Sequence, residues 1–195
     1  MAEPEPPQPP PVAFPPIRRQ WPLWFGPAVM ALVAWIGGAH QPGPLLVYPE
    51  TRALPLAWYI LEQALAVFLT LAALNAGAAI VSGRLLPRRL ALQTACDARF
   101  LLALAAAFVS RSVTDSFLPG TTPYLANLSP LAIAWLVVVT LAAGSLLVRV
   151  AMGYFRLLSS TVPRIWPCAG ALLIALVLGE FTAQMISHLL LPLLP

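Results

Sequence analysis

The chain has 195 residues, of which 59% are hydrophobic and only 9% are charged. Soluble proteins carry about a quarter charged residues, so this composition predicts an all-α, polytopic integral membrane protein. The net charge is +4, but the eleven arginines lie mainly near the ends of apolar segments. They form no basic stripe with interleaved aromatics, which excludes a nucleic-acid partner.

Residues 1–17 are rich in proline. Proline lacks a backbone N–H and favours the extended polyproline conformation, so this stretch is predicted to be a disordered cytoplasmic tail. A segment that docks in the aromatic groove of a partner is the alternative.

The remainder, residues 18–195, is predicted to be one helical membrane domain with five apolar spans. Each span can cross a hydrocarbon core of about 30 Å at 1.5 Å per residue. The expected spans are residues 21–39, 56–82, 98–118, 129–152 and 165–194. The first could instead belong to a cleaved export signal, since Gly37, Gly38 and Ala39 resemble a small-residue cleavage site.

Two features lie around the second span. Between His40 and Pro55 the chain contains several prolines and a glycine, which predicts a non-helical outer loop. Within the span, Ala73 and Gly77 are four residues apart, and such small residues allow another helix to approach closely.

The third span is interrupted by polar residues after Val109, so its hydrophobicity alone does not predict a crossing. The distribution of the arginines does predict one. Positive charge stays on the cytoplasmic side, and a crossing third span brings nine of the eleven arginines to one side. The N-terminus is then cytoplasmic and the C-terminus is outside. These nine are Arg18, Arg19, Arg84, Arg88, Arg89, Arg99, Arg149, Arg156 and Arg164, and the other two are Arg52 and Arg111.

Four ionisable residues within or near the spans are candidates for a buried polar cluster. Glu180 lies near the middle of the fifth span, where a carboxylate is costly without a partner, a water path or a proton. Arg111 lies at a matching depth in the third span and is its candidate partner. Asp115, one turn after Arg111, and Glu62, near the outer end of the second span, complete the cluster. The cluster could relay protons or ions, or it could fix helix packing.

The motifs of catalysis and metal binding are missing from the sequence. Cys96 and Cys168 are far apart, form no CxxC pair and are expected to be small buried residues. The serines lie in no nucleophile elbow, and no glycine-rich phosphate-binding pattern is present. We therefore expect no enzyme, no cofactor and no metal.

Residues 82–95, which read SerGlyArgLeuLeuProArgArgLeuAlaLeuGlnThrAla, follow the second span. This run of glycine, basic residues and then an ALxLxA-like pattern resembles the short basic segment of the Yip (Ypt-interacting-protein) family of five-span membrane proteins. The resemblance covers roughly residues 56–190 and implies an accessory or scaffolding membrane protein without catalytic residues.

The expected function is therefore that of an integral membrane interaction, scaffolding or accessory protein. Its partners would be the lipid bilayer and a protein or second copy within the membrane. The alternative is a small transporter or channel subunit that uses an intramembrane Arg/Glu pair. The lack of lysine and the abundance of alanine, arginine and proline are typical of a GC-rich genome, and we expect a bacterial inner membrane location.

Overall fold

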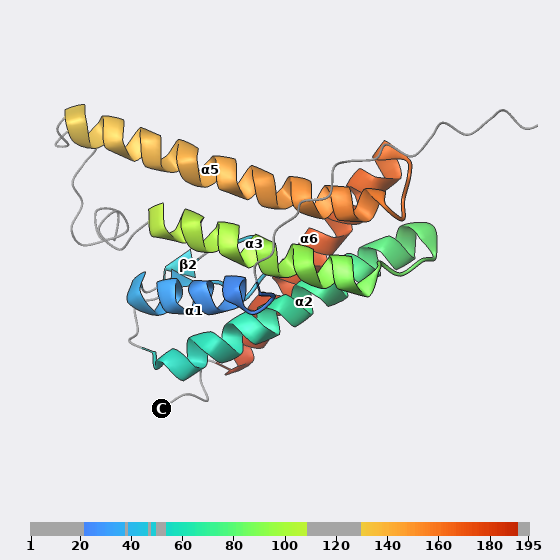
Figure 1. The fold of residues 1–195 in the computed structure, drawn as a ribbon, viewed down its shortest axis with the longest axis horizontal. Coiled ribbons are helices and arrows are strands. Elements are labelled where there is room, and N and C mark those ends of the chain that lie inside the picture. The colour runs from blue at the N-terminus through green and yellow to red at the C-terminus, as the bar shows by residue number, and fades with distance from the viewer. Residues whose placement is uncertain (1–21, 38, 47, 50–53, 109–129, 191–195) are drawn as a thin grey trace, which may run out of the picture.

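The computed structural model of the chain describes residues 22–37, 39–46, 48–49, 54–108 and 130–190. These residues form a bundle of helices with one short β-hairpin (Figure 1), which confirms the all-α fold. The elements are α1 (Phe25–Gly37), β1 (Ala39–His40), β2 (Tyr48–Pro49), α2 (Leu56–Ser82), α3 (Arg88–Phe108), α5 (Pro130–Ser159) and α6 (Ile165–Leu190).

Four of these helices, α2, α3, α5 and α6, are long and apolar enough to cross a membrane, so the chain is a multi-pass membrane protein. Helix α1 is apolar but has only 13 residues. At 1.5 Å per residue it extends about 20 Å, less than the hydrocarbon core of about 30 Å. The described helix is therefore shorter than the span expected over residues 21–39.

Helix α3 differs most from its expectation. It begins at Arg88 instead of near residue 98, and residues 109–118 of the expected span lie outside the described part of the chain. Arg99 consequently lies in the middle of the helix and is fully buried. Its assignment to the connection before the third span was wrong, because the polar residues at the start of α3 belong to the helix.

Small residues bring the helices together. Ala73 and Gly77 of α2 are buried, and a Cβ atom at Gly77 would collide with the carbonyl oxygen of Ala171 in α6. A Cβ at Gly26 of α1 would likewise collide with the carbonyl oxygen of Cys96 in α3. This confirms that the small face of α2 allows close approach of another helix.

The main hydrophobic core lies between these helix pairs and includes Leu74, Leu102 and Val150. Cys96 and Cys168 are free thiols and are buried, as expected for small core residues. The α2–α3 and α5–α6 connections lie at the same end of the bundle (Figure 1). Gly83 ends α2 with φ 67°, a conformation that favours glycine.

Candidate functional site

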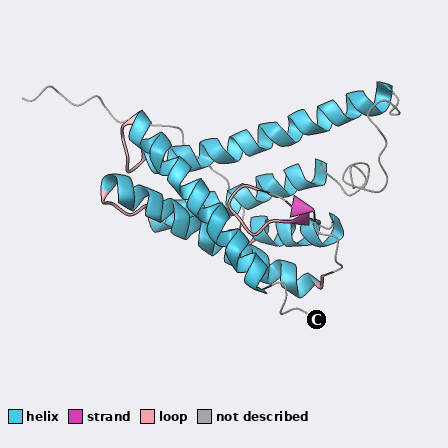
Figure 2. Ribbon diagram, turned by 180° about the vertical axis from the view of Figure 1, so that it is seen from behind, coloured by secondary structure: helices cyan, strands magenta, loops and turns pink. Residues whose placement is uncertain are grey.

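The hairpin between α1 and α2 carries the least ordinary feature of the bundle. Ala39 pairs with Pro49 and His40 with Tyr48, and the chain between the two strands turns inward. Figure 2 shows the hairpin and its connecting loop among the helices, not beyond their ends. We call residues 41–46 the inserted loop, and its first four residues, from Gln41 to Pro44, are buried.

The position of the inserted loop creates a hydrogen-bonding requirement. Proline and glycine at residues 42–44 prevent a helix there, so the backbone cannot satisfy its own polar groups. Non-helical backbone at membrane depth is tolerated only where protein or a water-filled cavity surrounds it. Side chains of four different helices meet this requirement.

Two carboxylates accept hydrogen bonds from the N–H groups of the loop. Glu62 Oε1, on α2, accepts from the Gln41 backbone nitrogen at 2.6 Å. Glu180 Oε1, on α6, accepts from the backbone nitrogens of Leu45 at 2.5 Å and Leu46 at 2.8 Å. Each end of the loop is therefore anchored by a carboxyl oxygen from a different helix.

Arg99 of α3 binds the carbonyl side of the same loop. Its Nη1 donates to the Gln41 carbonyl oxygen at 3.4 Å, and its Nη2 donates to the Gly43 carbonyl oxygen at 2.9 Å. Nη2 also reaches Thr70 Oγ1 on α2, at 3.3 Å. The guanidinium is fully buried, so these acceptors replace the water that would otherwise solvate it.

Tyr154 of α5 completes the set of contacts. Its hydroxyl donates to the Pro44 carbonyl oxygen at 3.2 Å, and the side chain is fully buried. Helices α2, α3, α5 and α6 therefore each contribute at least one polar side chain to the loop. We call Glu62, Arg99, Tyr154 and Glu180, together with Thr70, which binds Arg99, the loop-binding cluster.

Two glycines make room for the loop against α6. A Cβ atom at Gly43 would collide with the Glu180 carboxylate, so the loop backbone lies directly against that side chain. A Cβ at Gly179 would lie 2.6 Å from Pro44 Cγ and 3.1 Å from Ala73 Cβ. The loop thus packs directly against α6, close to the point where Ala73 of α2 also approaches that helix.

Some buried polar atoms of this region have no hydrogen-bond partner among the described residues. They include both amide atoms of Gln41 and of Gln63, together with Arg99 Nε and Glu180 Oε2. Buried polar groups usually find a partner or an ordered water. The region therefore combines several anchored backbone groups of the loop with a few buried donors and acceptors that are not used.

The candidate residues from the sequence are divided between the cluster and the undescribed part of the chain. Glu62 and Glu180 both bind the inserted loop. Arg111 and Asp115 lie outside the described residues, so the pairing of Arg111 with Glu180 stays a prediction.

Arg99, Thr70 and Tyr154 were missed as site residues. In the sequence, Arg99 contributes only to the arginine distribution that predicts the topology. Thr70 and Tyr154 each carry a hydroxyl group within an apolar run, and side chains of this kind are common in membrane helices. Neither residue is therefore marked as a site residue by the sequence. The prolines of the loop were one available signal, because they predicted a non-helical segment. The prediction that this segment lies outside the membrane domain was wrong, since residues 41–44 are buried.

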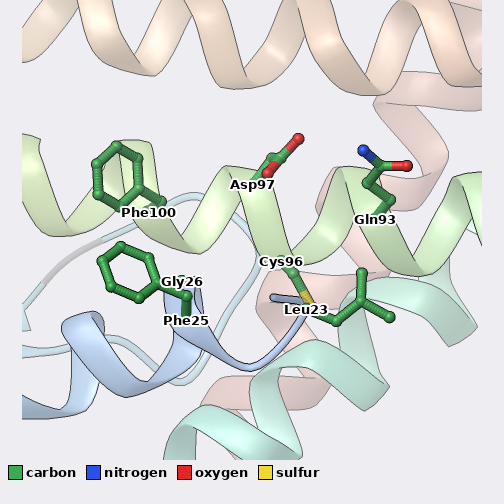
Figure 3. A pocket seen from close by; sticks show the side chains of 7 residues that line it. All are labelled: Leu23, Phe25, Gly26, Gln93, Cys96, Asp97 and Phe100. Atoms are coloured by element: carbon green, nitrogen blue, oxygen red, sulfur yellow. The ribbon is translucent and has the colours of Figure 1, made fainter. Parts of the chain in front are cut away.

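A small hollow lies between α1 and α3 (Figure 3), with a volume of about 10 Å³, enough for one water molecule. Its lining includes the side chains of Phe25, Cys96, Asp97 and Phe100. Within the described residues, no group of three or more histidine, cysteine or acidic side chains could hold a metal ion.

The fold and the cluster define an all-α, multi-pass membrane protein with a polar-anchored loop inside its bundle. No protein-family model, curated protein or solved structure matches this chain.

Proposed function

We propose that the protein is a non-catalytic interaction, scaffolding or accessory component of a bacterial inner membrane. The observation that carries this proposal is that the buried polar side chains bind the backbone of the inserted loop. Glu62 and Glu180 accept hydrogen bonds from loop N–H groups, and Arg99 and Tyr154 donate to loop carbonyls. These side chains serve the chain's own backbone, as expected of a packing role and not of a substrate site.

The role of Arg99 supports the same interpretation. In ion-coupled transporters, unwound backbone carbonyls coordinate the transported ion near the midplane. Here the carbonyl oxygens of Gln41 and Gly43, with Thr70 Oγ1, accept hydrogen bonds from a guanidinium tethered to α3. A positive charge that cannot leave its site stabilises a fixed loop and does not carry charge across the membrane.

Partners are proposed to lie within the membrane, as a protein or a second copy of the chain. This agrees with what the resemblance to the Yip family implies. A photo-crosslinking residue placed at Leu131 or Leu141, which are exposed on α5, is expected to capture one protein of defined mass in native membranes. The same residue at Val150, which is buried, is the matched control and should capture none. Equal labelling from all three positions, or from none, would contradict an interaction role.

The proposed orientation places the N-terminus in the cytoplasm and the C-terminus outside. The arginines of the α2–α3 and α5–α6 connections support it. Cysteines introduced at Leu85 and Trp166, exposed residues at these connections, should resist an impermeant thiol reagent in intact cells and react after permeabilisation. Labelling in intact cells would reverse the orientation.

A small transporter or channel subunit is the second candidate. The observation that favours it is the set of unused buried polar atoms, especially the amides of Gln41 and Gln63. Hydrogen exchange of the Leu45 and Leu46 amides in lipid nanodiscs separates the two. A packed loop protects these amides as strongly as the α2 amides, whereas a water-filled cavity allows fast exchange. Fast exchange together with an ion flux lost in Glu180→Gln would establish transport instead.

A further inference from the structure

We propose that the basic end of the bundle binds the headgroups of anionic phospholipids. The basic end is the set of six arginines at and near the α2–α3 and α5–α6 connections. All six side chains are exposed, and they are Arg84, Arg88, Arg89, Arg149, Arg156 and Arg164. The interaction role proposed above does not rest on this surface; only the proposed orientation draws on the same arginines.

The two connections lie at the same end of the bundle (Figure 1). The approach of Gly77 to Ala171 holds the end of α2 against the start of α6. A Cβ at Gly153 of α5 would lie 3.8 Å from Thr94 Cγ2, which places the end of α5 beside the start of α3. The arginines of both connections therefore belong to one surface.

The stretches of sequence that carry these arginines contain no acidic residue of their own. Residues 63–96 contain no aspartate or glutamate, and neither do residues 130–179. The nearest described acidic residue along α3 is Asp97, about two and a half turns after Arg88 at 3.6 residues per turn. A surface of this charge attracts anions, and guanidinium groups bind phosphate through paired hydrogen bonds.

The apolar neighbours of the arginines favour a lipid over an acidic protein segment. Leu85 and Ile165 are each 72% exposed and Trp166 is 86% exposed, directly beside Arg84 and Arg164. Tryptophan is enriched at the membrane–water interface, where its ring is at headgroup level. These side chains place the arginines at the depth of lipid phosphates.

Arg149 extends the surface along α5. It lies ten residues before the end of a 30-residue helix. At 1.5 Å per residue α5 is about 45 Å long, roughly 15 Å more than a hydrocarbon core, so part of the helix extends beyond that core. Its neighbours Val148 and Met152 are exposed, so the Arg149 guanidinium can reach along a lipid-facing surface to a phosphate.

The test measures binding of fluorescent phosphatidylglycerol and phosphatidylcholine to the full chain in neutral detergent. Wild type is expected to prefer the anionic lipid, and the preference should weaken as salt rises from about 0.01 M to about 1 M. The triple variant Arg88→Gln, Arg89→Gln, Arg164→Gln should lose affinity for phosphatidylglycerol by about fivefold per arginine, on the order of 100-fold in all. Its phosphatidylcholine binding should not change.

The matched control replaces the same three residues by lysine, which keeps the charge and should retain most of the preference. Thermal unfolding of each variant establishes that it is folded. If the glutamine variant does not fold, the salt dependence of wild type decides the proposal. Equal binding of the two lipids by wild type, or a preference insensitive to salt, would overturn it, and an acidic protein segment would then become the candidate partner.

Discussion

The contact between α2 and α6 and the loop-binding cluster hold the same bundle together by opposite means. At the first, Gly77 and Ala73 allow the helix backbones to meet without polar groups. At the second, charged side chains bind backbone groups inside the bundle. A close apolar contact loses stability gradually when its fit is disturbed. A buried charged cluster loses much more when one member is removed, because the others are left without partners.

The largest expected effect comes from Arg99→Met. The change leaves the Gln41 and Gly43 carbonyls without their donor and removes the positive charge near Glu62 and Glu180. We expect a loss of roughly 3 to 5 kcal/mol in the free energy of unfolding in detergent, as for other broken buried pairs. Denaturant unfolding measures it. A loss similar to that of an exposed substitution, Arg88→Met, would show that the cluster contributes little.

Glu180→Ala is expected to come next, at about 2 to 3 kcal/mol, because two loop N–H groups lose their carboxyl acceptor. Double-mutant cycles then identify its charge partner. If Arg99 is the partner, Arg99→Met and Glu180→Ala couple by about 0.5 to 3 kcal/mol, whereas Arg111→Met and Glu180→Ala are additive. Coupling to Arg111 instead would confirm the pair predicted from the sequence.

Gly77→Ala tests the apolar contact. The new methyl group meets the Ala171 carbonyl oxygen, and overpacking of this kind costs about 1 to 3 kcal/mol. Gly144→Ala is the matched control, since a Cβ there has nothing within 4 Å. Thermal unfolding in detergent should separate the two variants. Equal stabilities would mean that α2 and α6 do not pack at this distance.

The smallest effect is expected for Tyr154→Phe, which removes one hydroxyl and its 3.2 Å hydrogen bond to the Pro44 carbonyl. The expected loss is about 0.5 to 1.5 kcal/mol, well below that of Arg99→Met. The same unfolding assay measures it. A loss as large as that of Arg99→Met would place Tyr154, not Arg99, at the centre of the cluster.

Long apolar runs allowed much of the fold to be predicted. The run from Leu56 to Ser82 is α2 with the expected bounds, and Pro130 begins α5 one residue after the expected start. The start of α3 was missed because its first turns carry Arg88, Arg89 and Asp97, which resemble a polar connection.

The candidate site was less accessible to sequence reasoning. Glu62 and Glu180 stand out because carboxylates are rare in apolar runs. Their main partners are backbone groups of a loop, and a sequence shows no partner of that kind. Prolines indicate that a segment is not helical, but contacts with distant helices decide whether it lies outside or inside the bundle.

The anchoring of the loop also orders the assembly of the protein during its synthesis. Leu46 and its acceptor Glu180 are 134 residues apart. At about 5 to 20 residues per second, the ribosome adds Glu180 roughly 7 to 27 s after Leu46. Until then the end of the loop has no carboxylate to bind, so insertion of the loop is completed last. A nascent chain stopped before α6 should therefore leave this loop open to protease, whereas the full-length chain protects it.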